Sequence, residues 1–135
     1  MTKSKKKPSG ICSIYRKLLE RLPSTYPQGK LIVHASLTEL NECYWNDDSE
    51  DPGDPGHPPF AYCDGNDNSI HVATQLHKET RESIIWYFLH EIGHLYAYQH
   101  YGSKDRRWKN YREAERYANQ FASRWANKLK RERWI

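Results

Sequence analysis

Residues 83–101 read SIIWYFLHEIGHLYAYQHY and place an H-E-x-x-H motif inside a mostly apolar run. On an α-helix, side chains four positions apart lie on the same face, so the imidazoles of His90 and His94 can bind one metal ion. Glu91 lies about 100° away around the helix at about 3.6 residues per turn. It can therefore act as general base on a metal-bound water instead of ligating, which is the division of roles in zinc hydrolases.

The surroundings of the motif favour a metal site over a chance occurrence of three common residues. The run is apolar nearly all round, as expected for a helix in the centre of a domain. Two imidazoles and a carboxylate would be costly to desolvate there, and a metal ion supplies the compensating bonds. We expect this helix to begin near Thr80, whose hydroxyl can cap it, and to end near Gly102.

A zinc site of this kind needs a third protein ligand, and two residues compete for the role. Glu115 borders the apolar stripe of a last helix, residues 110–130. His100 can ligate only if the chain turns back after His94, because a continuous helix carries it about 9 Å farther along the axis. Ala97, a strong helix former, occupies the position where such a break would need glycine. We therefore expect Glu115 to ligate, with His100 as the alternative metal ligand.

Residues 115–122, ERYANQFA, resemble the E-x-x-A-N-x-F-A helix of the ImmA/IrrE-type zinc metallopeptidases, and more loosely the E-x-x-A-D helix of other gluzincins. The resemblance covers about residues 11–129. It implies a minimal zincin-like metallopeptidase domain in which Glu115 is the third zinc ligand and Asn119 supports the ligands. It also implies hydrolysis of peptide bonds in a protein substrate, such as a DNA-bound repressor or another regulator.

The spacing of His100 also fits SprT-like and metzincin proteases, which form the alternative class of enzyme. Two departures count against it, since Ala97 stands where metzincins have glycine and Met1, the only methionine, cannot form a downstream Met-turn. In either class an oxyanion donor is expected from a tyrosine or histidine near the metal, and His71, Tyr98 and His100 all remain open.

The rest of the chain predicts an α+β fold with an N-terminal helix and a small three- to four-stranded sheet ahead of the two site helices. Apolar spacing predicts a helix over residues 11–22, stopped by Pro23, and strands over residues 30–34, 42–45, 60–63 and 69–73. His71 alternates away from Ile70 and Val72, so we expect it to face solvent or a substrate groove. We expect residues 1–10 to be a basic flexible tail, residues 11–135 a single domain, and residues 46–59 a mobile acidic loop rich in proline and glycine.

Composition limits the classes of function. The 135 residues, 37% of them hydrophobic, fit one compact domain,. No apolar segment reaches the ~18 residues needed to cross a bilayer, so we expect no membrane association, and the lysine-rich start precedes no apolar signal segment. Three cysteines, an odd number without C-x-x-C spacing, predict a reducing cytoplasm,.

The last third of the chain is basic and interleaves lysines and arginines with Trp108, Trp125 and Trp134. Together with the N-terminal tail, such residues can contact phosphates, although the net charge of +4 is modest. We expect a weak nucleic-acid contact beside the main partner, a protein or peptide substrate. The alternative from another class is a basic nucleic-acid or partner-binding module with a structural zinc.

Overall fold

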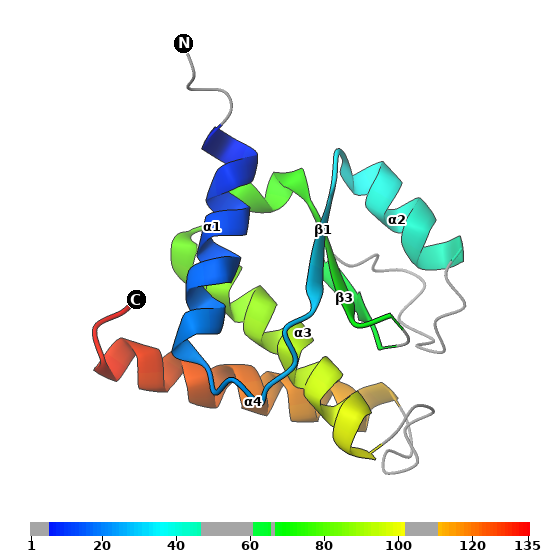
Figure 1. Cartoon of the computed structure of the whole chain (residues 1–135). Coiled ribbons are helices and arrows are strands. Elements are labelled where there is room, and N and C mark those ends of the chain that lie inside the picture. Colours follow the sequence, from blue (N-terminus) through cyan, green and yellow to red (C-terminus); the bar gives the residue numbers. More distant parts are fainter. Residues whose placement is uncertain (1–5, 47–60, 66, 102–110) are drawn as a thin grey trace.

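The computed structural model describes residues 6–46, 61–65, 67–101 and 111–135, and it has the predicted α+β architecture (Figure 1). Its sheet has three strands, the lower of the two predicted numbers. The elements follow in the order α1 (Lys6–Arg21), β1 (Lys30–His34), α2 (Leu37–Asn46), β2 (Ala61–Asp64), β3 (Ser69–Ala73), the 3₁₀ helix η2 (Thr74–Lys78), α3 (Arg81–Tyr101) and α4 (Tyr111–Arg131). No helix among these residues is long and apolar enough to cross a membrane.

The sheet has β3 in its centre, with strand order β1-β3-β2. β1 runs parallel to β3, and β2 runs antiparallel to it and forms the predicted hairpin with it. Side chains alternate along β3, so Ile70 and Val72 join the main core with α1 and α3, whereas Ala73 joins a smaller cluster with Leu40 of α2,. Helix α2 therefore covers one face of the sheet, and α1 and α3 cover the other.

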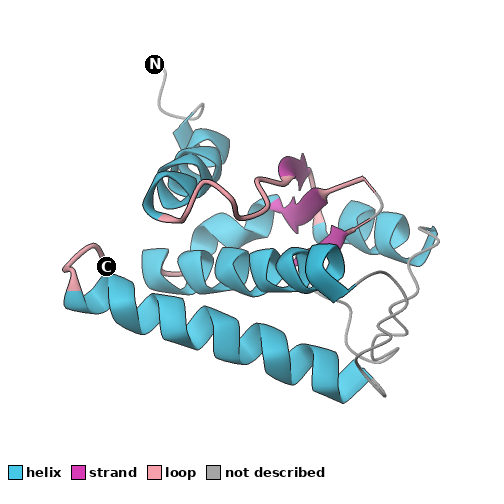
Figure 2. Cartoon of the chain, turned by 60° about the horizontal axis from the view of Figure 1, so that its bottom comes forward, coloured by secondary structure: helices cyan, strands magenta, loops and turns pink. Residues whose placement is uncertain are grey.

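Helix α3 is the central element of the main core. Its side chains Ile85, Phe88, Leu89 and Ile92 are fully buried, and each such side chain contributes about 1.5–3 kcal/mol on burial. The N–H of Ser83 donates to Oγ1 of Thr80 at 3.1 Å, which confirms the predicted cap,. Figure 2 shows α4 running alongside α3, and the two helices pack along their length.

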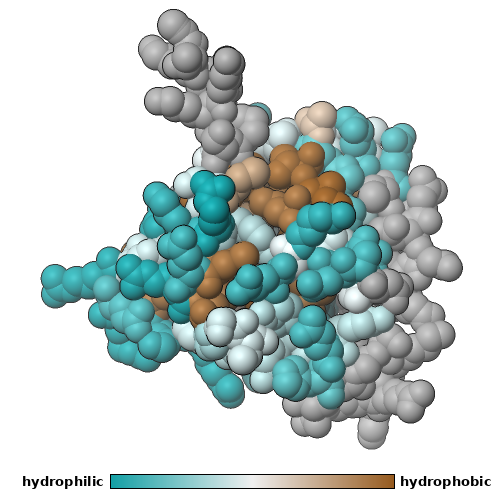
Figure 3. All heavy atoms as spheres, viewed as in Figure 1, coloured by the Kyte–Doolittle hydropathy of each residue, from teal (hydrophilic) through white to brown (hydrophobic). Residues whose placement is uncertain are grey.

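Strand β1 forms one edge of the sheet. Its bounds, like those of β3, are the ones that the sequence predicts. Leu31, Ile32 and Val33 are only partly buried, and Figure 3 shows hydrophobic atoms at the surface near this strand on an otherwise largely hydrophilic face. Pairing with β3 covers one edge of β1. The other edge of β1 has no strand partner in the described sheet, so these residues stay partly accessible.

Two predictions of secondary structure are wrong. Residues 42–45, predicted as a strand, belong to α2, because Ser36 caps a helix here through a 3.1 Å bond from the N–H of Glu39 and Leu40 is buried against the sheet,. Residues 6–10, predicted as part of the tail, begin α1, since the first turn of a helix tolerates Pro8. Residues 1–5, the acidic segment 47–59 and Gly102 lie outside the described residues.

The prediction of a solvent-facing His71 is also wrong, because only 6% of this residue is exposed. Its ring is stacked on that of Tyr62, with centroids 4.5 Å apart, and on that of His34, with centroids 5.1 Å apart. All three strands thus contribute one ring to the same face of the sheet, on the side of α2. The alternation along β3 was predicted correctly, but the face that carries His71 is covered by α2.

For a neutral imidazole, the hydrogen bonds of His71 select one tautomer. The hydroxyl of Ser69 donates its only proton to Oδ1 of Asp67 at 2.5 Å, so its oxygen accepts from Nε2–H of His71 at 3.0 Å,. Nδ1 of His71 then has a lone pair and accepts from Nε2–H of His34 at 2.9 Å,. The result is a directed chain of bonds from His34 to a carboxylate.

This series of hydrogen bonds from His34 to Asp67 predicts the effect of Ser69→Ala. The substitution removes the acceptor of the buried His71 Nε2–H, and an unsatisfied buried donor costs about 1–3 kcal/mol. The free energy of unfolding, measured by urea denaturation, should fall by that amount. Ser24→Ala, at an exposed position, should change it by less than about 0.5 kcal/mol. Equal stability of the two variants would contradict the chain.

Candidate metal centre

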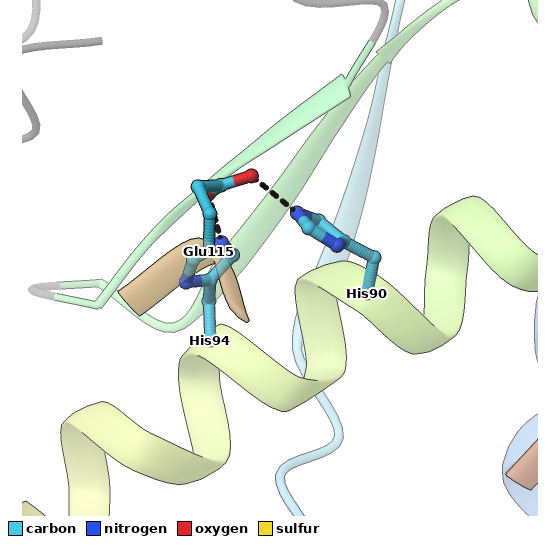
Figure 4. Close-up of side chains that lie close together, drawn as sticks. All are labelled: His90, His94 and Glu115. Carbon is cyan, nitrogen blue, oxygen red and sulfur yellow. Dashed lines mark hydrogen bonds and ion pairs between the residues drawn. The ribbon is translucent and has the colours of Figure 1, made fainter. Parts of the chain in front are cut away.

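The two histidines of the H-E-x-x-H motif meet the predicted third ligand in the structure. Figure 4 shows the rings of His90 and His94 on α3 directed toward the carboxylate of Glu115 on α4. Nε2 of His94 lies 2.7 Å from Oε2 of Glu115, and Nε2 of His90 lies 3.2 Å from Oε1. One ligand atom from each residue lies within 4.8 Å of the other two.

This group has the chemistry and the size of a metal site. Two imidazole nitrogens and a carboxylate oxygen are a known ligand set for catalytic zinc, at about 2.0–2.2 Å from the ion. In a tetrahedral arrangement such ligand atoms lie about 3.3–3.5 Å apart. This distance falls between the shortest separation in the group, 2.7 Å, and its upper limit, 4.8 Å. His90, His94 and Glu115 could therefore hold a metal ion, as the sequence predicts.

The close approach of α3 and α4 brings Glu115 within reach. A Cβ atom on Gly93 would lie 3.1 Å from the Phe121 side chain, tighter than nearly all real contacts. On α4, the fully buried residues that face α3 include Ala118 and Ala122, whose side chains are equally small. Small residues on both helices thus allow their backbones to approach, and Glu115, one turn before Ala118, reaches the histidines.

The ring of His90 is held in place by packing. The indole of Trp86, one turn earlier on α3, is stacked on it with centroids 5.3 Å apart. The side chain of His90 is only 11% exposed, and its Nδ1 is buried with no hydrogen-bond partner among the described residues. Metal-ligating histidines usually donate this second N–H to an acceptor, so here Trp86 has the orienting role.

Glu91 lies outside the ligand group and is buried, with 6% of the residue exposed. Burial raises the pKa of Glu91 above its usual range, and the nearby His90 and His94 oppose that rise. A hydrogen bond from the Cys63 side chain is a further, smaller influence that lowers the pKa of Glu91. A carboxylate made more basic by burial beside a metal site is suited to accepting a proton.

The pKa of Glu115 is shifted in the opposite direction. Burial by itself would raise its pKa, but hydrogen bonds from His90 and His94, together with their charges, outweigh burial and lower the pKa of Glu115 to about 2. The carboxylate is therefore ionised across the neutral range, as a metal ligand must be. The two carboxylates of the site thus differ as their predicted roles require.

The remaining candidates lie apart from the group. Asn119 is exposed on α4 and lies outside the group of three candidate ligands, so its supporting role stays a prediction. His100 lies near the end of an unbroken α3 with its ring stacked on Tyr96 at 4.1 Å, and it does not belong to the group. His71 faces α2, on the far side of the sheet from α3, which leaves Tyr98 and His100 as oxyanion candidates.

Two features of the site escaped the sequence analysis. The contact of Gly93 with Phe121 and the bond from Cys63 to Glu91 both join residues far apart in the chain. The motif spacing carries no signal for either. A weak signal exists for Cys63, because strand alternation gives it the same face as Ala61, but the register of β2 against α3 comes only from the fold.

Comparison with known proteins found no matching family model, no matching curated protein and no matching solved structure. The resemblance to the ImmA/IrrE-type metallopeptidases therefore rests on the two sequence motifs. The candidate metal position is defined by the side chains of His90, His94 and Glu115.

The lowered pKa of Glu115 predicts a pH dependence of stability in the metal-free protein. A carboxyl whose pKa falls from 4.5 to about 2 on folding stabilises the folded state fully above about pH 4.5,. This contribution is lost as the pH falls from about 4.5 toward about 2,. Glu115→Gln should therefore show a smaller loss of unfolding free energy across that window than the unsubstituted protein.

The measurement is urea denaturation at a series of pH values in the presence of a chelator. Glu20→Gln, which removes an exposed carboxylate on α1, is the matched control and should keep the unsubstituted slope. If Glu115→Gln and the unsubstituted protein lose stability in parallel, the ion pair with the histidines does not form in the metal-free state.

Proposed function

We propose that this chain is a zinc-dependent metallopeptidase with a minimal zincin-like domain. The observation that supports the proposal most strongly is the convergence of His90, His94 and Glu115 within 4.8 Å, with the buried Glu91 next to His90 but outside the ligand group. A structural zinc site has four protein ligands, whereas a catalytic site has three and leaves one position open. Among the described residues the group has three members, which favours catalysis.

The chemistry follows from the separate roles of these residues. His90, His94 and Glu115 would hold the ion, which when bound supplies Lewis acidity and makes a water molecule nucleophilic near neutral pH. Glu91 accepts a proton from the attacking water as the new C–O bond forms at the scissile carbonyl. It then delivers this proton to the amine that leaves when the C–N bond breaks.

The sheet offers a place for an extended substrate. β2 is an edge strand of the described sheet and packs against α3, the helix that carries the motif. A peptide in extended conformation can pair with such an edge through main-chain hydrogen bonds. This geometry supports a protein or peptide substrate over a small molecule.

The regulator suggested by the family resemblance, a DNA-bound repressor, is consistent with the surface of α4. Its outward side carries the exposed residues Arg116, Arg124 and Lys128, which can contact phosphates. Lys128 is already paired with Glu132, so the expected contact is weak. Nucleic-acid binding is part of the proposal as a way to localise the protease.

The SprT-like or metzincin alternative requires the chain to leave helical geometry between His94 and His100. Helix α3 continues without interruption to Tyr101, and Ala97, where a break would be needed, is a buried helical residue. The geometry therefore favours Glu115 as the third ligand.

Metal analysis of two variants tests the ligand set. The purified protein should hold about one zinc, because three ligands leave one open position on a single ion. Glu115→Ala should release the zinc and lower the thermal midpoint, since a metal that binds only the native state stabilises it. His100→Ala, the matched control, should keep its zinc. The reverse pattern would establish the alternative ligand set.

Substitution of the proposed base tests the reaction. Glu91→Gln should keep the zinc but lose about 10²- to 10⁴-fold in the rate of hydrolysis of denatured casein, because the amide cannot accept a proton. Glu20→Gln should keep both. Loss of zinc from Glu91→Gln would make Glu91 a ligand, and a zinc-loaded protein without any hydrolytic activity would favour the structural-zinc binding module.

A further inference from the structure

The packed helices α3 and α4 carry aromatic side chains on the side away from the candidate metal centre. Around α3, Tyr96 lies about 200° from His94, at about 100° per residue. Around α4, Phe121 lies about 60° to one side of the buried Ala118, whereas Glu115 lies about 60° to the other side. The rings of Tyr96 and Phe121 are neighbours, with centroids 5.8 Å apart. The helix pair thus has one side with metal ligands and another side with aromatic rings.

A further ring joins these two from the loop between α1 and β1. Figure 1 shows this loop passing in front of α4, and the ring centroid of Tyr26 lies 5.1 Å from that of Tyr96 and 5.8 Å from that of Trp125. At the other end, His100 is stacked on Tyr96 with centroids 4.1 Å apart. His100, Tyr96, Tyr26 and Trp125 therefore form a continuous aromatic row across three segments of the chain.

The aromatic row is accessible from outside. His100 is exposed, and Tyr26, Tyr96 and Trp125 are each partly exposed. Tyr26 and Trp125 also pack against the main core, which anchors their rings from within. Contiguous exposed rings on a soluble domain mark a binding surface more often than isolated ones do, and fixed rings lose little conformational entropy when a ligand stacks on them.

Positive charge borders the aromatic row on α4. The exposed residues Arg124, Lys128 and Arg131 lie about 80–140° from the line that faces α3, on the same side as the rings,. Nζ of Lys128 lies 5.7 Å from the centroid of the Trp125 ring. Lys128 also pairs with Glu132 at 2.5 Å, but an exposed pair of this kind is weak and a phosphate can compete with it.

We propose that the aromatic row binds a single-stranded nucleic acid. Bases of a single strand stack on aromatic rings while lysines and arginines contact the phosphates, and the stacking uses base faces that every sequence has. A duplex keeps these faces inside its own stack. A proline-rich peptide can also pack on aromatic rings, but it has no phosphates to use the three bordering cations.

The inference does not depend on peptidase activity. It goes beyond the phosphate contact of the proposed function, because phosphate contacts alone do not distinguish a single strand from a duplex. The aromatic row supplies that distinction. Binding of this kind would hold the protein on exposed single strands.

Fluorescence anisotropy of a fluorescein-labelled oligothymidylate tests the inference on the full chain. The protein should bind this single strand more tightly than a duplex of the same length. Tyr26→Leu keeps an apolar side chain over α4 but removes the ring, so it should bind the single strand about tenfold more weakly, which is the effect of losing about one stacked base. Tyr26→Phe, the matched control, keeps the ring and should keep the affinity.

Two further variants make the test independent of the folding of Tyr26→Leu. His100→Ala removes the exposed end of the row and should also weaken binding of the single strand, at a position where substitution changes stability little,. Arg124→Gln should reduce the slope of log affinity against log salt concentration by about 0.7, the value for one phosphate contact of a single strand. Lys78→Gln, which removes an exposed charge from η2, should keep the slope.

Three results would overturn the inference. The first is no binding of the oligothymidylate. The second is unchanged affinity in His100→Ala or in a Tyr26→Leu variant with the circular dichroism of the unsubstituted protein, because binding would then use phosphates alone. The third is a duplex, or a proline-rich peptide, that binds as tightly as the single strand and loses affinity in the same variants.

Discussion

The close packing of α4 against α3 is the constraint on which the candidate site depends. Helix α3 carries His90, Glu91 and His94 within the most buried part of the molecule, where unpaired polar groups are costly,. Gly93 and the small residues of α4 allow the two backbones to approach, and this approach brings Glu115 to both imidazoles. Without it Glu115 would not reach the two histidines.

The sheet contributes a second level of organisation, because its two faces hold different polar systems. On the α3 face, Glu91 is buried beside His90 and His94, and these histidines and Cys63 lower its pKa against the effect of burial. On the α2 face, His71 forms the directed chain of bonds from His34 to Asp67. Each system satisfies groups that burial would otherwise leave unpaired. The sheet separates them, so the histidines of the strands and those of the helix have no common ligand position.

Much of this arrangement can be predicted from local sequence patterns. The periods of 3.6 and 2 residues predicted α1, α3, α4, β1 and β3, and the wheel position of Glu115 predicted that it lies toward the two histidines. These features depend on which face of an element a residue occupies. Such information is contained in the spacing of a single segment.

The errors have a different origin. The helix that replaced the predicted strand at residues 42–45 depends on a cap at Ser36 and on packing of Leu40 against the sheet. The burial of His71 depends on rings from two other strands, and the place of Cys63 at the main core depends on the packing of β2 against α3. Each is a contact between segments, which local periodicity cannot encode.

The central claim is that His90, His94 and Glu115 bind one zinc ion together. Anomalous X-ray diffraction at the zinc absorption edge, from crystals of the protein purified without chelator, tests it most directly. The account predicts one anomalous peak at about 2.0–2.2 Å from Nε2 of both histidines and from a carboxylate oxygen of Glu115. A peak bound by His100 in place of Glu115, or no peak between the three side chains, would contradict it.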